Sequence, residues 1–172
     1  MAGCLVLDAS AFQADEPGPR SPCSRDDVVS SLALMPLAHK ACWRICIPLE
    51  ASDELHRSLS RLYSNNAVYS VIYDIIGRRE RKISYVPLEG CYDRLSEEEL
   101  NLLEGLRDTD RFYPLLASCI AAGLAGECRG CDRVVLVTCD DEMFAVGARL
   151  GRLAGFEVMT PRAALDELHV SR

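Results

Sequence analysis

Two short apolar segments that lead to carboxylates constrain the fold of this chain more than any other feature. Residues 5–7 are followed at once by Asp8, and residues 134–137 are followed, after two further residues, by Asp140. Short, fully apolar segments are typical of strands that are buried on both faces of a parallel sheet. Ligands of such sheets bind beyond the carboxyl ends of the strands. We therefore predict that Asp8 and Asp140 lie near one another at one edge of a sheet.

Strand-like and helix-like segments alternate along the whole chain. Strands are expected at residues 3–8, 43–47, 83–86, 133–138 and 156–159. Helices are expected at about 26–40 (with a break near Pro36), 52–63, 67–76, from 96 onward, 110–124, 142–154 and 161–168. This alternation predicts an α/β fold, a three-layer α/β/α sandwich around a mostly parallel sheet of four to five strands. No internal repeat or linker divides the chain, so we expect residues 1–172 to form a single domain.

The composition is that of a soluble globular protein, with 49% hydrophobic and 26% charged residues among 172. The apolar stretches are too short for a membrane span, and no secretory signal begins the chain, so we expect a cytoplasmic protein. The net charge is −7. This charge counts against a broad basic surface for nucleic acid, but it is compatible with an enzyme that contacts phosphates through a metal ion.

The chain contains nine cysteines, an odd and high number. Without a secretory signal, we expect reduced thiols that pack as small apolar side chains and no disulfide framework. Cys128 and Cys131 have the spacing of a zinc-ligand pair. Two further ligands would be needed, for which Cys91 and Cys119 are candidates.

Several segments resemble the PIN-domain family of nucleases. Residues 5–12 (LVLDASAF) resemble the opening strand of that family, and residues 135–143 (VLVTCDDEM) resemble its fourth-strand motif. In that motif an apolar strand ends in Val-Thr, followed by a small residue, an Asp and a second acid two residues later. Residues 154–161 (AGFEVMTP) are similar to the final strand, and the segment after Pro48 is similar to the helix that carries the second acid. The resemblance spans nearly the whole chain and is weakest between about residues 63 and 107.

The resemblance implies a compact α/β/α nuclease with three or four carboxylates around one or two divalent metal ions, Mg²⁺ or Mn²⁺. Members of the family usually cleave single-stranded or structured RNA. The four implied acids, in chain order, are Asp8, Glu54, Asp110 (with Asp108 as the alternative third acid) and Asp140, and Glu142 is a possible additional metal ligand. The chain departs from the family pattern in the long spacing between the third and fourth acids, and in Cys139, where glycine or another small residue is common.

The chemistry of phosphodiester hydrolysis agrees with this assignment. The reaction needs an activated water and neutralised charge on the phosphate, and a divalent ion bound by carboxylates supplies both. The hydroxyls of Ser10 and Thr138 are candidates to orient a water or bind a phosphate. Arg57 and Arg61 follow Glu54 at one-turn spacing, so they are candidates to contact the substrate.

Several alternatives remain open at this point. Asp8 and Asp140 are also suited to capping a turn or helix, and Glu54 to a solvated helix surface. The chain could be a catalytically inactive PIN-like module that binds a protein or RNA partner. It could also be the toxin of a toxin–antitoxin pair, with an antitoxin as partner, or a structural zinc protein built on its cysteines. Many PIN-like proteins form homodimers.

Overall fold

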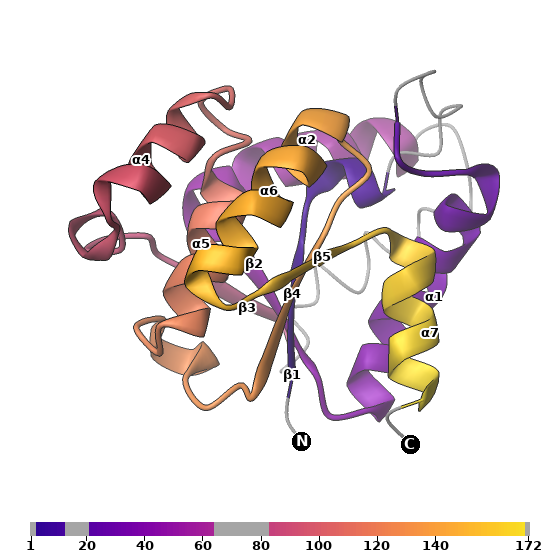
Figure 1. Ribbon diagram of the computed structural model, residues 1–172. Coiled ribbons are helices and arrows are strands. Elements are labelled where there is room, and N and C mark those ends of the chain that lie inside the picture. Colours follow the sequence, from indigo (N-terminus) through magenta and orange to yellow (C-terminus); the bar gives the residue numbers. More distant parts are fainter. Residues whose placement is uncertain (1–2, 13–20, 64–82, 171–172) are drawn as a thin grey trace.

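A computed structural model describes residues 3–12, 21–63 and 83–170 of the chain (Figure 1). Five strands form one sheet in the order β3-β2-β1-β4-β5, and every neighbouring pair is parallel. The strands are β1 (Gly3–Leu7), β2 (Arg44–Pro48), β3 (Ile83–Val86), β4 (Arg133–Val137) and β5 (Glu157–Met159). The central strand β1 therefore pairs with β2 on one side and with β4, from the far end of the chain, on the other.

Helices cover both faces of this sheet. They are α1 (Arg25–Lys40), α2 (Ser52–Tyr63), α4 (Glu97–Glu104), α5 (Phe112–Ala121), α6 (Asp141–Ala154) and α7 (Pro161–Val170). Short 3₁₀ turns are η1 (Ala9–Phe12), η2 (Leu49–Ala51), η3 (Tyr92–Arg94) and η4 (Gly126–Cys128). Helices α1 and α7 lie against each other on one face, while α5 and α6 cover the other and α4 packs on α6 (Figure 1). The predicted three-layer α/β/α sandwich is thus confirmed.

Each face of the sheet has its own hydrophobic core, because alternate strand residues point to opposite faces. Leu5 of β1 packs with Leu34 of α1 in one core, and the neighbouring Val6 packs with Leu150 of α6 in the other. All four side chains are at most 1% exposed. Such burial on both faces explains why β1 and β4 read as unbroken apolar segments in the sequence.

The structure differs from the sequence prediction in local detail. Helix α1 continues through Pro36 without the expected break, because α1 packs along α7 and tertiary packing outweighs the local cost of an interior proline. Helix α5 begins at Phe112 and leaves Asp110 in the preceding turn. The helix predicted at 67–76 lies outside the described residues. Across the described ranges, no helix combines the length and apolar character that crossing a membrane requires.

Candidate functional site

The two predicted acids meet where the strand order of the sheet reverses. The chain proceeds from β1 toward β2 and β3 on one side, and β4 and β5 lie on the other. In open parallel sheets the ligand crevice opens at the carboxyl ends of the strands at this reversal point. Leu7 and Val137, the last residues of β1 and β4, are register partners, and the Asp8 N–H donates to the Val137 carbonyl oxygen at 3.0 Å. Asp8 therefore continues the pairing of the two strands beyond their carboxyl ends.

Two hydroxyl groups hold the carboxylate of Asp8, which is only 4% exposed. The Thr138 hydroxyl donates to Asp8 Oδ2 at 2.8 Å, and the Ser10 hydroxyl donates to the same oxygen. Each hydroxyl oxygen in turn accepts a backbone N–H, from Cys139 at 2.9 Å for Ser10 and from Asp140 at 3.0 Å for Thr138. Because both hydroxyls donate to Oδ2, the other oxygen, Oδ1, is the one that would be available to a cation.

The charged form of Asp8 is disfavoured in the folded protein. Burial raises the pKa of Asp8 from 3.8 to about 6, against the opposite effect of the hydrogen bonds from Ser10 and Thr138. The negative charges of Asp110 and Asp140 raise this pKa further. A cation at this position would remove both causes of the shift, since it would compensate the buried charge and screen its neighbours.

Asp140 occupies the N-cap of α6, and its Oδ1 accepts the Met143 N–H at 2.7 Å. The capping alternative is therefore confirmed for this residue. The bond fixes the orientation of the carboxylate and involves one of its two oxygens, so capping and metal binding are compatible.

Asp110 joins the same group of acids from the turn before α5. Burial raises the pKa of Asp110, and the charges of Asp140, Glu54 and Glu142 raise it further, while Arg107 acts in the opposite direction. These electrostatic contacts place Glu54, in the first turn of α2, near the other acids. The structure thus gathers acids from four separate segments of the chain at the end of the sheet.

The structure also distinguishes between the two candidates for the third acid. The side chain of Asp108 is 96% exposed and forms an ion pair with Arg111 at 2.8 Å. Asp110 is partly buried and interacts with the acids of the cluster. The geometry therefore favours Asp110.

The acids form an open group, not a tight cage. Among the described residues, three ligand atoms within 4.8 Å of one another are found for cysteines but for no set of carboxylates. Mg²⁺ keeps several of its waters and usually binds through one or two carboxylates, so a spaced set of oxygen ligands fits a hydrated Mg²⁺ or Mn²⁺ ion.

Tyr113 of α5 is part of this site and was not identified from the sequence. The residue is 1% exposed, and its hydroxyl lies near the backbone N–H of Ala9 but makes no full hydrogen bond to a described group. Burial raises the pKa of Tyr113, and so do the charges of Asp8 and Glu54, while the Ala9 N–H lowers it. The hydroxyl therefore lies at the acidic cluster with its proton free to donate to a ligand. A spacing of three residues from Asp110 is the sequence feature that could have identified it.

The predicted substrate-binding residues do not all lie at the acidic cluster. Ser10 and Thr138 hold Asp8, as described above. Arg57 is exposed, and its Nε donates to the Asp53 carbonyl oxygen of its own helix at 3.2 Å. Arg61 belongs to α2, but its side chain is outside the described part of the structure.

The structure pairs eight of the nine cysteines in disulfides and leaves Cys42 free and exposed. The pairs are Cys4–Cys131, Cys23–Cys139, Cys46–Cys128 and Cys91–Cys119. The expectation of reduced thiols is therefore wrong for this structure. The expectation that Cys91 or Cys119 completes a metal site with Cys128 and Cys131 is also wrong, because Cys91 and Cys119 form a disulfide with each other. Both errors arise because the local sequence around a cysteine does not reveal which other cysteines lie beside it in the fold.

The chain matches no protein-family model, and no curated protein matches it. The class that the structure defines is an α/β/α protein with a five-stranded parallel sheet and an acidic cluster at its reversal point.

Proposed function

We propose that this protein is a PIN-like, divalent-metal-dependent endoribonuclease that binds Mg²⁺ or Mn²⁺ through Asp8, Glu54, Asp110 and Asp140. The observation that carries the proposal is the convergence of acids from four segments around a buried carboxylate. Burial raises the pKa values of Asp8 and Asp110, and the negative charges of the neighbouring acids raise them further. Strongly perturbed groups gathered in one place are characteristic of functional sites, and a cation is the natural compensation for clustered carboxylates.

The residues of the cluster would divide the chemistry between them. A divalent ion at such a site neutralises charge on the phosphate and activates a water. Asp8 offers Oδ1 in an orientation held by Ser10 and Thr138, and Asp140 is oriented by its cap bond. Glu142, exposed on the first turn of α6, is an additional ligand at the rim.

RNA is the proposed substrate because of the resemblance to PIN domains. The net charge of −7 implies that the phosphates are contacted chiefly through the metal. A toxin role with an antitoxin partner, homodimer formation and a cytoplasmic location remain predictions from the sequence.

An inactive PIN-like module that binds a protein or RNA partner is the second candidate. The acidic net charge of −7 favours it, since it weakens the attraction of the protein for the phosphates of an RNA substrate.

Cleavage of labelled single-stranded and hairpin RNAs with Mn²⁺, with and without EDTA, tests the nuclease proposal. The wild type is expected to cut only with metal, and Asp140→Asn is expected to cut at least about 100-fold more slowly, because one ligand is lost. Asparagine caps helices as well as aspartate does, so the fold of this variant is retained. Asp141→Asn, the same change at the adjacent exposed acid, is the control and should cut normally.

The assay also distinguishes the second candidate. If the wild type cuts nothing and millimolar Mn²⁺ leaves its thermal stability unchanged, the nuclease proposal fails, because an ion that binds only the folded state must raise that stability. Equal cutting by Asp140→Asn and the wild type would place the activity outside this cluster.

A pair of substitutions tests the assignment of the third acid. Asp110→Asn is expected to weaken Mn²⁺ binding by at least about 10-fold, since it removes a charge from the cluster. Asp108→Asn removes an exposed ion pair worth less than about 1 kcal/mol and should leave Mn²⁺ binding unchanged. Titration of Mn²⁺ against each variant, followed by thermal unfolding, measures both effects. The assignment is reversed if Asp108→Asn is the variant that loses affinity.

A further inference from the structure

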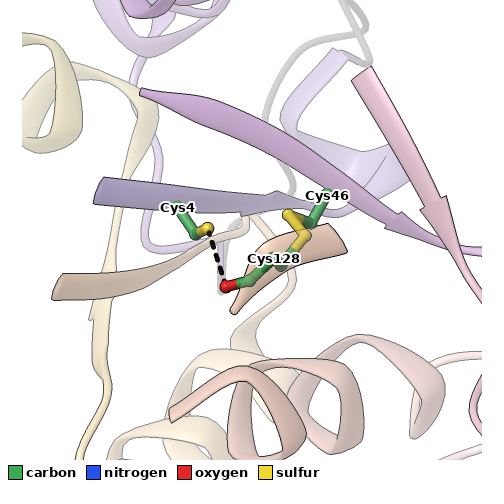
Figure 2. A group of neighbouring side chains, drawn as sticks. All are labelled: Cys4, Cys46 and Cys128. Carbon is green, nitrogen blue, oxygen red and sulfur yellow. Dashed lines mark hydrogen bonds between the residues drawn. A yellow bond between two sulfur atoms is a disulfide. The ribbon is translucent and has the colours of Figure 1, made fainter. Parts of the chain in front are cut away.

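Four cysteines converge at a second place in the fold, under the sheet on the face that α5 covers. Cys4 lies in β1 and Cys46 in the adjacent strand β2, where both belong to the same hydrophobic core. Cys128 ends η4, the turn that crosses below them, and Cys131 follows three residues later. Cys4, Cys46 and Cys128 are each 0% exposed. Figure 2 shows these three side chains converging from two strands and a turn, with the Cys4 sulfur 4.0 Å from the Cys128 carbonyl oxygen.

Three of the four sulfur atoms lie close together and the fourth is bonded to one of them, although the four belong to two disulfides. The sulfurs of Cys4, Cys46 and Cys128 lie within 4.8 Å of one another, and Cys131 is bonded directly to Cys4. The sulfurs of Cys23–Cys139 and Cys91–Cys119 belong to no such group in the described chain. Four cysteine sulfurs gathered in one place are the ligand set of a tetrahedral metal ion.

The backbone spacing of one pair also suits a metal. The Cα atoms of Cys46 and Cys128 are 7.3 Å apart, compared with 5.3 Å for Cys23–Cys139 and 5.7 Å for Cys91–Cys119. Disulfides usually span Cα distances of about 4.4–6.8 Å. A zinc ion bonded to two sulfurs at about 2.3 Å each holds those sulfurs farther apart than a disulfide does, so it accommodates a wider backbone spacing.

The turn between Cys128 and Cys131 has the form that a pair of ligands requires. The sequence is Cys-Arg-Gly-Cys, the two-residue spacing of zinc-binding turns. Gly130 has a φ of +81°, a left-handed conformation that glycine adopts without strain. This reversal of the chain brings both cysteines of the turn to the sulfurs of the two strands.

We propose that Cys4, Cys46, Cys128 and Cys131, in their thiol form, bind one structural Zn²⁺ ion as four thiolates. The four thiols release four protons to solvent when the ion binds, and no electrons are transferred. Sulfur ligands select zinc over Mg²⁺ or Mn²⁺, so this site and the acidic cluster take different ions. With four protein ligands and three of them fully buried, the site has no open position, which is the arrangement of a structural zinc site and not of a catalytic one. A thiol reductant supplies two electrons and two protons to each disulfide to give these four thiols, so the two disulfides and the zinc site are alternative states of the same four sulfurs.

The zinc content and thiol state of the full-length protein, purified under reducing conditions, test the proposal together. We expect about one zinc per chain by elemental analysis, as a four-thiolate site requires. Unfolding in EDTA with an alkylating reagent and no reductant should then label all four cysteines, because zinc thiolates become free thiols when the ion is removed. Replacement of zinc by Co²⁺ should give the visible absorption bands of tetrahedral cobalt thiolate.

Matched cysteine substitutions assign the site. Cys131→Ser, which changes the least buried of the four ligands, should lose zinc to a chelator that leaves the wild type loaded. Cys42→Ser, the same change at the free exposed cysteine, should retain zinc as the wild type does. If Cys131→Ser fails to fold, the zinc content, alkylation and cobalt spectrum of the wild type still decide the question.

Three results would overturn the proposal. The first is protection of the four cysteines from alkylation until a reductant is added, with no zinc present, which would show two permanent disulfides. The second is fully reduced protein that takes up no zinc or cobalt when titrated with either ion. The third is bound iron in place of zinc.

Discussion

Asp8→Asn is expected to stabilise the metal-free protein at neutral pH while it abolishes metal-dependent RNA cleavage. Burial raises the pKa of Asp8 from 3.8 to about 6, so the folded state resists the ionisation that the unfolded chain undergoes freely. A shift of this size corresponds to about 3 kcal/mol at pH values above the folded pKa. Asparagine carries no charge, and its oxygen can still accept the hydroxyls of Ser10 and Thr138.

The sign of the pH dependence follows from the direction of the shift. Between pH 3.8 and about 6 the folded protein holds a proton on Asp8 that the unfolded chain has released. The free energy of unfolding of the wild type should therefore fall as the pH rises through this window and level off above pH 6. The free energy of unfolding of Asp8→Asn should lack the part of this decrease that Asp8 causes.

Urea unfolding in EDTA between pH 4 and pH 8 measures the effect, with Asp141→Asn as a control that should follow the wild type. Added Mn²⁺ should then stabilise the wild type and Asp141→Asn but not Asp8→Asn. A variant that is less stable than the wild type at pH 7.5 and still cleaves RNA would contradict both the electrostatic account and the metal site.

Gly151→Ala is expected to destabilise the fold by about 3 kcal/mol. A Cβ at Gly151 in α6 would lie 2.3 Å from the carbonyl oxygen of Phe156, which is backbone and cannot rotate away. The two segments are tied together, because the Gly151 carbonyl accepts the N–H groups of Gly155 at 2.8 Å and Phe156 at 3.1 Å. The gain of about 1 kcal/mol from the better helix propensity of alanine is too small to offset this overlap.

Gly147→Ala, one turn earlier on the same helix, is the matched control. Its nearest neighbours would be the ends of the Val158 and Leu136 side chains, at 3.1 and 3.2 Å, which can shift by a few tenths of an ångström. We expect a change within about 1 kcal/mol, because the helix propensity gained offsets the mild crowding. Urea unfolding of the two variants compares them directly, and equal losses of stability would show that the close approach to Phe156 is unimportant.

Most of the fold could be predicted from the sequence because its local patterns agree with its tertiary structure. Ser96 is the N-cap of helix α4: its side chain accepts the Glu99 N–H, and the Glu99 carboxylate accepts the Ser96 N–H, as the acidic residues after Ser96 indicate. Gly155 caps the end of helix α6 in a left-handed conformation, as expected for a terminal glycine. Whether the helix breaks at Pro36 could not be predicted, because the answer depends on the packing of α1 on α7, which the local sequence does not reveal.

From the residue pattern alone, the candidate site could be predicted only where an acid closely follows a strand, and Glu54 and Asp110 were predicted from the resemblance to PIN domains. Asp8 and Asp140 meet because parallel strands share one carboxyl edge, which is a general property of such sheets. Tyr113 was missed because a tyrosine within an apolar helix resembles an ordinary core residue.

Of the cysteine cluster, only Cys128 and Cys131 were identified from the sequence. Cys4 and Cys46 were missed because they join the cluster only when β2 lies beside β1 and η4 packs against both, which no local sequence pattern predicts.

The pairing of β1 with β4 has a consequence for the way this protein is made. The ribosome synthesises β1 before β4, and the hydroxyl of Thr138, which holds Asp8, comes 130 positions after that residue. A chain whose synthesis stops before β4 contains Asp8 without Thr138 or Asp140, and its β1 lacks one of its two neighbours. The acidic cluster is therefore assembled only after β4 and Asp140 have been synthesised, so products terminated before β4 cannot contain it.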